Sequence, residues 1–265
     1  MAIKVEQENH HHGHDVGERL YLHRHSLVHS LPSHLKIIAA VAFIVVVVST
    51  PVTQWQAFIA YFVWLLSVVK IAKIPFLLLF KRALIEVPFI FFAILMPFFG
   101  SGEKIQVGPF DLYREGVIAG SGIVVKGTLG VMTAIILSTS TTAREILRGL
   151  ERLKLPVLMV QIASFMLRYV NVVNDEMERM KVARESRGFI ATGIKDWKVL
   201  ATAASALFIR SYERGERVHL AMLSRGYTGV LPHDQSEGAT LRLWLQGLAL
   251  PIFAAAILLI TTVIG

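Results

Sequence analysis

Long apolar runs dominate this sequence, and they limit the folds that are open to it. A helix needs about 20 mostly apolar residues to cross a bilayer. Five stretches reach or approach that length, at residues 35–50, 52–69, 83–100, 117–138 and 243–264. Apolar residues make up 54% of the 265 residues, more than an ordinary soluble domain of this length contains. The expected fold is an all-α integral membrane protein with about five transmembrane helices and a further set of cytoplasmic helices.

The distribution of basic residues predicts an orientation, because Lys and Arg accumulate in cytoplasmic loops. They fill the link between the second and third runs and crowd the 139–242 segment, whereas the 100–115 link is balanced. A cytoplasmic N-terminus and an external C-terminus satisfy these links together. The chain then divides into four parts. Residues 1–34 are expected to form a His-rich cytoplasmic segment without a cleaved signal, and residues 35–138 the first four transmembrane helices. Residues 139–242 are expected to form a cytoplasmic region, and residues 243–265 the last transmembrane helix.

Two shorter apolar stretches, 156–172 and 197–209, are ambiguous. Each has an arginine toward its end, Arg168 within the first and Arg210 directly after the second, and neither is long or uninterrupted enough to be a firm span. We expect them to pack beneath the membrane or to dip into it. If both crossed fully, the orientation of the termini would be unchanged, but the stretch between them would lie outside.

Within 139–242 the sequence predicts a series of helices. Thr141 and Thr142 can cap a first helix that ends by Pro156. A second helix is expected over 174–187, with Asn174 and Asp175 at its start and Gly188 after it. A third is expected over 211–225, with Ser211 as its cap and Gly226 as its stop.

Both of the last two helices end in the same signature, Ser-Arg-Gly followed by an aromatic residue. The copies are Ser186-Arg187-Gly188-Phe189 and Ser224-Arg225-Gly226-Tyr227. Arg favours the negative end of a helix and Gly is common just beyond it, so one copy is explained as a helix stop. Two copies with small residues on both sides of Arg favour a second interpretation. An unobstructed guanidinium is a planar fork suited to carboxylates, so the two ends could dock two similar acidic grooves.

The residues around these copies resemble a known family. "KVARESRGF" and "ERVHLAMLSRGYTG" resemble the two Arg motifs of the transmembrane T component of energy-coupling-factor transporters. "SLVHSLPSHLKI" is similar to that family's N-terminal entry, although Pro32 and Lys36 are farther apart than the family pattern usually has them. The "ERGERVHLAM" run and the length of the chain are most similar to the cobalt-type branch.

The resemblance implies a non-catalytic scaffold. It would join a substrate-capture membrane subunit, and in some systems a further small membrane subunit, to two cytoplasmic ATPase subunits in a bacterial or archaeal inner membrane. The docking residues would be Arg187 and Arg225 with their small neighbours, together with one more arginine: Ser186, Gly188, Ser224, Gly226 and Arg184. ATP and Mg²⁺ would be bound by the ATPases. The transported ion would be cobalt, with nickel chemically close.

Other functional classes find little support in the sequence. The nearest approach to a phosphate loop has Thr128 where a lysine is required, and it lies in an apolar run. His-Glu-x-x-His and Gly-x-Ser-x-Gly motifs are absent, there is no cysteine, and no nucleic-acid-binding motif accompanies the net charge of +8. If the chain serves an ATP-driven process, hydrolysis belongs to a partner.

Two observations leave alternatives open. Histidines cluster at 10–14 and recur at 23, 25, 29 and 34, where they could collect cobalt or nickel or could form a solvated tail. Glu86 and Lys126 lie within apolar runs. They could line the path of a self-sufficient channel or carrier, or Glu86 could snorkel to a membrane face while Lys126 pairs inside the bundle. A membrane-bound metalloenzyme using the histidines is a third possibility.

Overall fold

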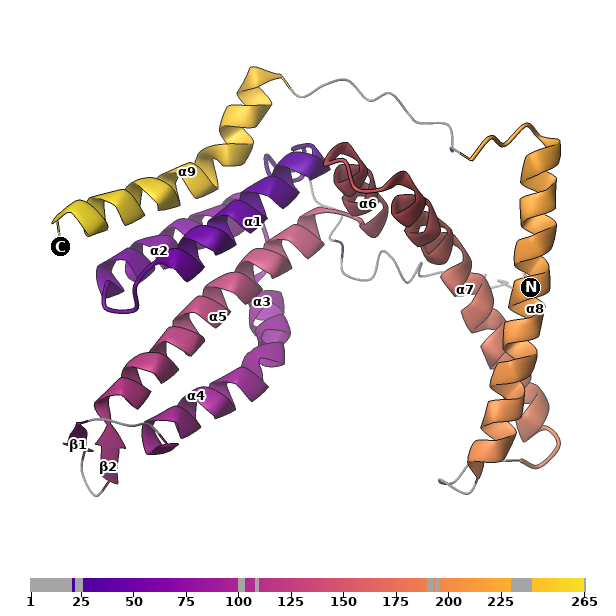
Figure 1. The fold of residues 1–265 in the computed structure, drawn as a ribbon, viewed down its shortest axis with the longest axis horizontal. Coiled ribbons are helices and arrows are strands. Elements are labelled where there is room, and N and C mark those ends of the chain that lie inside the picture. The colour runs from indigo at the N-terminus through magenta and orange to yellow at the C-terminus, as the bar shows by residue number, and fades with distance from the viewer. Residues whose placement is uncertain are drawn as a thin grey trace, which may run out of the picture. The chain divides into compact units, whose positions relative to one another are not determined.

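The computed structural model describes residue 21 and residues 26–99, 103–107, 110–189, 193, 196–229 and 240–264. Helices dominate these residues, as the sequence predicts (Figure 1). The elements are α1 Ser33–Ser49, α2 Trp55–Ile71, α3 Phe76–Ala83, η2 Leu84–Glu86, α4 Val87–Phe99, β1 Lys104–Val107, β2 Phe110–Tyr113, α5 Arg114–Ser140, α6 Ala143–Arg152, α7 Val157–Glu185, α8 Trp197–Ser224 and α9 Leu241–Ile264. They form two compact units, which are described separately below; one comprises 154–236 with the first 19 residues, and the other the rest.

The larger unit contains the predicted spans. Its core lies among α1, α2, α5 and α9 and is centred on Tyr61, which is fully buried. The rings of Phe43 and Phe58 meet Tyr61 edge-on, each with ring centroids 6.1 Å apart. The Tyr61 hydroxyl lies 3.2 Å from Thr50 Oγ1 and donates to the Ala254 carbonyl oxygen at 3.3 Å. The aromatic core therefore also links the end of α1 to α9.

The third predicted span, 83–100, is not one helix. The chain forms α3, then a single 3₁₀ turn, η2, and then α4, which contains Pro97. A 3₁₀ turn is tighter than an α-helix and changes the direction of the chain. Glu86 lies in this turn, so the bend places a carboxylate at the surface shared with α5.

Helices α4 and α5 lie side by side (Figure 1) and approach closely at two glycines of α5. A Cβ at Gly116 would lie 2.4 Å from the Met96 carbonyl oxygen, and one at Gly120 would lie 2.5 Å from the Ala93 carbonyl oxygen. Small residues four apart let membrane helices pack backbone to backbone. Helix α4 also exposes many aromatic and aliphatic side chains, among them Phe89, Phe91, Phe92, Ile94 and Phe98.

A two-stranded antiparallel hairpin connects α4 to α5, with Lys104 opposite Tyr113 and Val107 opposite Phe110. The all-α prediction contains no strands, so the hairpin is an addition to it. Arg114, the first residue of α5, donates its backbone N–H to the Glu103 carbonyl oxygen at 3.0 Å and closes the hairpin onto the helix.

The start of α1 holds the junction between α5 and α6. Lys36 is only 7% exposed, and its ammonium donates to the carbonyl oxygens of Ser140 at 2.8 Å and His29 at 3.1 Å. Helix α6 begins with the predicted cap: Thr142 and Glu145 each accept the other's backbone N–H, a capping box. Gly149 lies so close to α1 that a Cβ there would be 3.0 Å from the His34 backbone nitrogen.

The smaller unit contains α7 and α8, and here two predictions of helix boundaries are wrong. Residues 157–185 form one helix, and so do residues 197–224. Asn174 and Asp175 therefore do not begin a helix, and neither does Ser211. Helix α7 contains no Gly or Pro, and the single glycine of α8, Gly215, does not break it. Each helix therefore continues without a break where its sequence changes from apolar to charged residues.

The predicted end of α6 also needs correction. The helix stops at Arg152, before Pro156. Lys154 adopts a left-handed conformation, with φ of 63°, and α7 starts directly after Pro156. Proline disfavours helical geometry in the preceding residue, which explains why the break lies upstream of it.

Candidate functional site

The two Ser-Arg-Gly copies end α7 and α8 with the same backbone geometry. Gly188 and Gly226 have φ of +77° and +83°, the left-handed conformation that favours glycine. The Phe189 N–H donates to the Arg184 carbonyl oxygen at 3.1 Å, and the Tyr227 N–H donates to that of Met222 at 3.0 Å. This six-to-one bond defines a Schellman stop. The repeated signature is thus a repeated helix ending, as the simpler interpretation predicts.

The side chains of the two copies are also arranged alike. The Ser186 hydroxyl donates to the Ala183 carbonyl oxygen at 3.1 Å, and the Ser224 hydroxyl donates to that of Ala221 at 2.9 Å. Each serine is therefore turned back onto its own helix. Arg187 and Arg225 are exposed, and within the described residues neither guanidinium has an ion-pair or hydrogen-bond partner. The structure leaves both planar forks available to a ligand outside the chain.

The surroundings of the two copies differ. Tyr227 donates its hydroxyl to Gln161 Oε1 at 3.1 Å, and Gln161 Nε2 donates to the Gly229 carbonyl oxygen at 3.0 Å. Gln161, in the first part of α7, is only 6% exposed. The second copy is therefore bound to α7 through a buried amide. Sequence reasoning missed Gln161, because a lone glutamine in an apolar stretch carries no spacing signal.

The first copy has a second arginine that the other lacks. Arg184 is half-buried, and its carbonyl oxygen accepts the Phe189 N–H. The corresponding position of the second copy is Met222. The docking set expected from the sequence is therefore symmetric in Ser, Arg and Gly but not in Arg184.

Helices α7 and α8 run back along one another (Figure 1) and bury little between them. Arg210 of α8 forms an ion pair with Glu176 of α7. Within α7, Phe165 stacks over Tyr169 with ring centroids 6.5 Å apart. No residue of α8 is buried. The two helices expose large apolar side chains, among them Leu158, Met166, Phe208, Tyr212 and Leu220. A helix pair with so small a core depends on further surfaces to cover it.

The two charged residues of the apolar runs have separate partners. Glu86 is 3% exposed, and its two carboxylate oxygens lie 3.0 and 3.1 Å from Thr128 Oγ1. The 3₁₀ turn directs Glu86 against α5, and this burial does not favour the alternative in which Glu86 snorkels to a membrane face. Lys126 donates to the Val48 carbonyl oxygen, at the end of α1, at 2.7 Å. Each group thus ties one helix to another.

The histidines give no metal centre in the described part of the chain. Residues 10–14, 23 and 25 lie outside the described residues. His29 and His34 have other contacts: His29 Nδ1 lies 2.7 Å from Ser26 Oγ, and His34 Nδ1 lies 3.4 Å from an Arg152 nitrogen. Among the described residues, no group of three or more His, Cys, Asp or Glu is placed to hold a metal ion.

Three described helices are long and apolar enough to cross a membrane by length and composition: α5, α7 and Leu241–Thr262 of α9. The apolar helices α1 and α2 have 17 residues each. At 1.5 Å per residue each is about 26 Å long, a little less than a bilayer's hydrocarbon core of about 30 Å. The lengths and apolar composition of these helices, together with the exposed apolar side chains of α4 and α9, are those of a membrane protein.

Comparison with known proteins agrees with this geometry. A family model described as "CbiQ: Cobalt transport protein" matches residues 24–237. The energy-coupling factor transporter transmembrane protein EcfT of Bacillus subtilis is 28% identical over 218 residues, covering 77% of this chain and 82% of the relative. A putative fused cobalt transport protein CbiMQ of Methanocorpusculum labreanum is 27% identical over 222 residues, covering 77% of this chain and 35% of the relative.

A further relative is an uncharacterized protein of Methanocaldococcus jannaschii, 33% identical over 135 residues, which are 49% of this chain and 50% of the relative. The family model spans most of the chain, from before α1 to beyond the second Ser-Arg-Gly copy. The match therefore includes the apolar helices that precede α9 and the two arginine-bearing helix ends. The chain belongs to the CbiQ family of cobalt transport proteins and is an all-α membrane protein related to the transmembrane components of energy-coupling factor transporters.

Proposed function

We propose that this chain is the coupling subunit of an ATP-driven cobalt importer, in which it links two cytoplasmic ATPase subunits to a substrate-capture membrane subunit. The observation that carries the proposal is the pair of equivalent helix ends that present Arg187 and Arg225 unpaired. Two like ends suit two copies of one partner. A carboxylate-lined groove would receive each guanidinium as a planar, two-bond contact.

The stop geometry supports this role as well as helix termination. A Schellman stop satisfies the last carbonyls of the helix internally, so the arginine is not needed to cap its own helix. The serine hydroxyl is bonded back to the helix, and glycine has no side chain. The guanidinium is thus the largest polar group at each end, and Ser186, Gly188, Ser224 and Gly226 keep the space around it open.

The nearly coreless pair α7 and α8 supports a surface made for partners. The cost of holding 28 or 29 residues in a helix has to be offset by packing. The exposed apolar residues of both helices offer that packing to a capture subunit. The relative described as a fused CbiMQ protein joins a CbiQ-like part to another cobalt transport protein in one chain. We extend that association to this chain as two separate subunits.

Cobalt as the transported ion rests on the family description and on the name of that relative. In the proposal the capture subunit holds the metal, so this chain needs no ligand cluster of its own. ATP and Mg²⁺ are bound by the ATPases. The competing reading, a self-sufficient cation carrier with Glu86 and Lys126 on its path, gains no support from the separate partners of these two groups.

The proposed orientation places the N-terminus, α7 and α8 in the cytoplasm of a bacterial or archaeal inner membrane. Helix α7 meets the composition of a span, but its apolar part ends at Asn174. Those 17 residues from Val157 to Val173 are about as long as α1 and α2, at about 26 Å, but they contain an arginine, Arg168, away from both of their ends. The proposal therefore keeps α7 on the cytoplasmic side, with its apolar half against the membrane or a partner.

Purification of the assembled transporter tests the function. The complex should contain two ATPase subunits and a capture subunit for each copy of this chain, and its ATP hydrolysis should respond to cobalt. Recovery of the chain alone, with cobalt uptake that needs no nucleotide, would favour the carrier. Because the chain contains no cysteine, labelling of Lys181→Cys and Glu103→Cys variants with an impermeant thiol reagent tests the orientation. Glu103 should react from outside and Lys181 only after the membrane is opened.

A further inference from the structure

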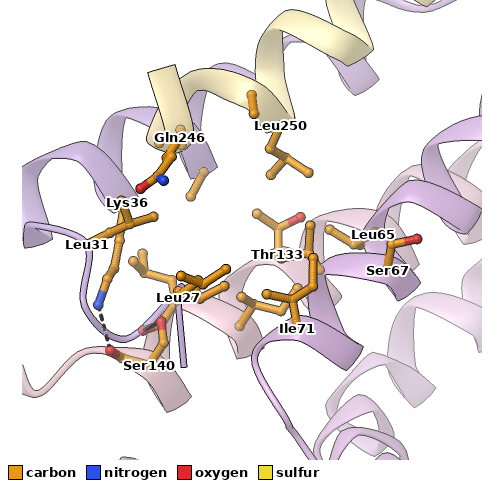
Figure 2. A pocket seen from close by; sticks show the side chains of 18 of the residues that line it. Leu27, Leu31, Lys36, Leu65, Ser67, Ile71, Thr133, Ser140, Gln246 and Leu250 are labelled. Carbon is orange, nitrogen blue, oxygen red and sulfur yellow. Dashed lines mark hydrogen bonds between the residues drawn. The ribbon is translucent and has the colours of Figure 1, made fainter. Parts of the chain in front are cut away.

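A half-open cavity of about 290 Å³ lies among the ends of α1, α2, α5 and α9 and the segment before α1. Figure 2 shows Gln246 and Leu250 of α9 facing Leu27, Thr133 and Ile71 across it. Most of the lining side chains are aliphatic. Such a volume is close to the lower end of ordinary ligand pockets. No lining residue belongs to either Ser-Arg-Gly copy, so the cavity is a separate feature from the proposed docking ends.

One donor in the wall of this cavity has no acceptor. Trp64 lines the cavity, and its indole Nε1 is buried without a hydrogen-bond acceptor among the described residues. The ring is held in place against Phe253, with ring centroids 4.5 Å apart. A buried N–H without a partner destabilises a structure. This atom is closed off from the open space of the cavity, so Trp64 contributes to the apolar wall through its ring carbons.

Basic residues lie at or next to the helix ends that line the cavity. The Lys36 ammonium lies at the cavity wall and uses two of its three N–H donors on the carbonyl oxygens of Ser140 and His29 (Figure 2 shows the first of these bonds). Exposed Lys70 directly precedes the lining residue Ile71. Exposed Arg242 lies one helical turn before the lining residue Gln246, on the same side of α9.

We propose that this cavity holds one acyl chain of an anionic phospholipid. The aliphatic walls and the Trp64 ring contact the chain, and the phosphate pairs with Lys70 and Arg242. Basic pockets at the ends of transmembrane helices bind anionic headgroups. A lipid fits these observations better than a helix of a partner, because it combines an apolar chain and a negative charge in one slender molecule. The proposal depends on neither the orientation nor the docking role.

Fluorescence quenching by brominated lipids tests the proposal. Trp55→Phe, Trp197→Phe and Trp244→Phe together leave Trp64 as the only tryptophan of the full chain. The protein is reconstituted in phosphatidylcholine vesicles that contain a small fraction of phospholipid brominated on its acyl chain. Brominated phosphatidylglycerol should quench Trp64 at a several-fold lower mole fraction than brominated phosphatidylcholine does.

Two sets of variants locate the site. Lys70→Gln with Arg242→Gln should remove the preference for the anionic lipid, whereas the charge-matched pair Lys81→Gln and Arg179→Gln should keep it. Ser67→Leu, which adds bulk to the wall, should reduce quenching by both lipids in protein that melts as the parent does. Equal quenching by the two brominated lipids would mean ordinary lipid contact and would overturn the proposal. Absence of quenching by either would mean that something else fills the cavity, and it would overturn the proposal as well.

Discussion

The contact between α4 and α5 depends on glycine at two positions, and Gly120→Ala is the sharpest test of it. A Cβ at position 120 would lie 2.5 Å from the Ala93 carbonyl oxygen, which is backbone and cannot rotate away. Carbon and oxygen normally approach to about 3.3–3.6 Å. The two helices must therefore separate by about 1 Å at this level, and their other contacts must loosen with them.

Overpacking of this kind typically costs about 1–3 kcal/mol. Alanine returns some of that cost, because it is favoured over glycine in a helix by about 1 kcal/mol. Gly130→Ala, in the same helix, is the matched control, since nothing lies within 4 Å of a Cβ there. Gly130→Ala should gain the helix propensity alone. The two variants therefore receive the same propensity gain and differ only in the clash.

Thermal unfolding of the purified chain in detergent separates the two variants. The midpoint of Gly120→Ala should lie below that of the parent, and the midpoint of Gly130→Ala should equal or exceed that of the parent. If the two variants melt together, α4 does not approach α5 at Gly120 as described, and the account of the glycine contact is wrong.

Two further predictions concern the junction and the tail. Lys36→Met should lower the unfolding midpoint well below that of the exposed control Lys181→Met. The carbonyl oxygens of Ser140 and His29 lose their hydrogen bonds in this variant, and bonds from a charged donor contribute about 1.5–3 kcal/mol each. Equal midpoints for the two variants would contradict the buried contact. Deletion of residues 1–14 should leave assembly with the ATPases intact, as judged by co-purification, and should lower cobalt uptake only when the metal is limiting. Loss of the complex on deletion would show that the tail has a structural role.

The positions of helices and caps were largely predictable from the sequence, because they depend on local signals. The apolar runs predicted α1, α2, α5 and α9, and the Thr142 cap and both glycine stops lie where the sequence placed them. The lengths of α7 and α8 were not predictable in this way. A polar pair such as Asn174 and Asp175 can begin a helix or continue one, and only the absence of Gly and Pro around it indicates that α7 runs on.

Contacts between distant residues escaped prediction for a different reason. Gln161 meets Tyr227, and Lys36 meets Ser140, across 66 and 104 residues of chain. No local pattern records such partners. The hairpin at 104–113 did have a signal, since two short stretches of "KIQV" and "FDLY" flank a Gly-Pro pair, which is typical of a turn.

Docking of the ATPases by the two helix ends is the central claim, and co-purification tests it most directly. Removing one partner of a buried charge pair typically costs about 2–5 kcal/mol. Arg187→Ala or Arg225→Ala alone should weaken the complex partly, because the two ATPases hold each other and one dock remains. The double variant should lose the ATPases and cobalt uptake while still inserting in the membrane.

The control is Arg179→Ala with Arg217→Ala, which removes one exposed arginine from each of α7 and α8 away from the helix ends. Arg→Lys at both docks should also impair assembly, since an ammonium cannot form the planar two-bond contact. The measurement is the amount of ATPase that co-purifies with each variant. The account predicts wild-type amounts for the control pair and a near-complete loss for Arg187→Ala with Arg225→Ala. Wild-type amounts for that double variant would contradict the account and leave the two Ser-Arg-Gly copies as helix stops alone.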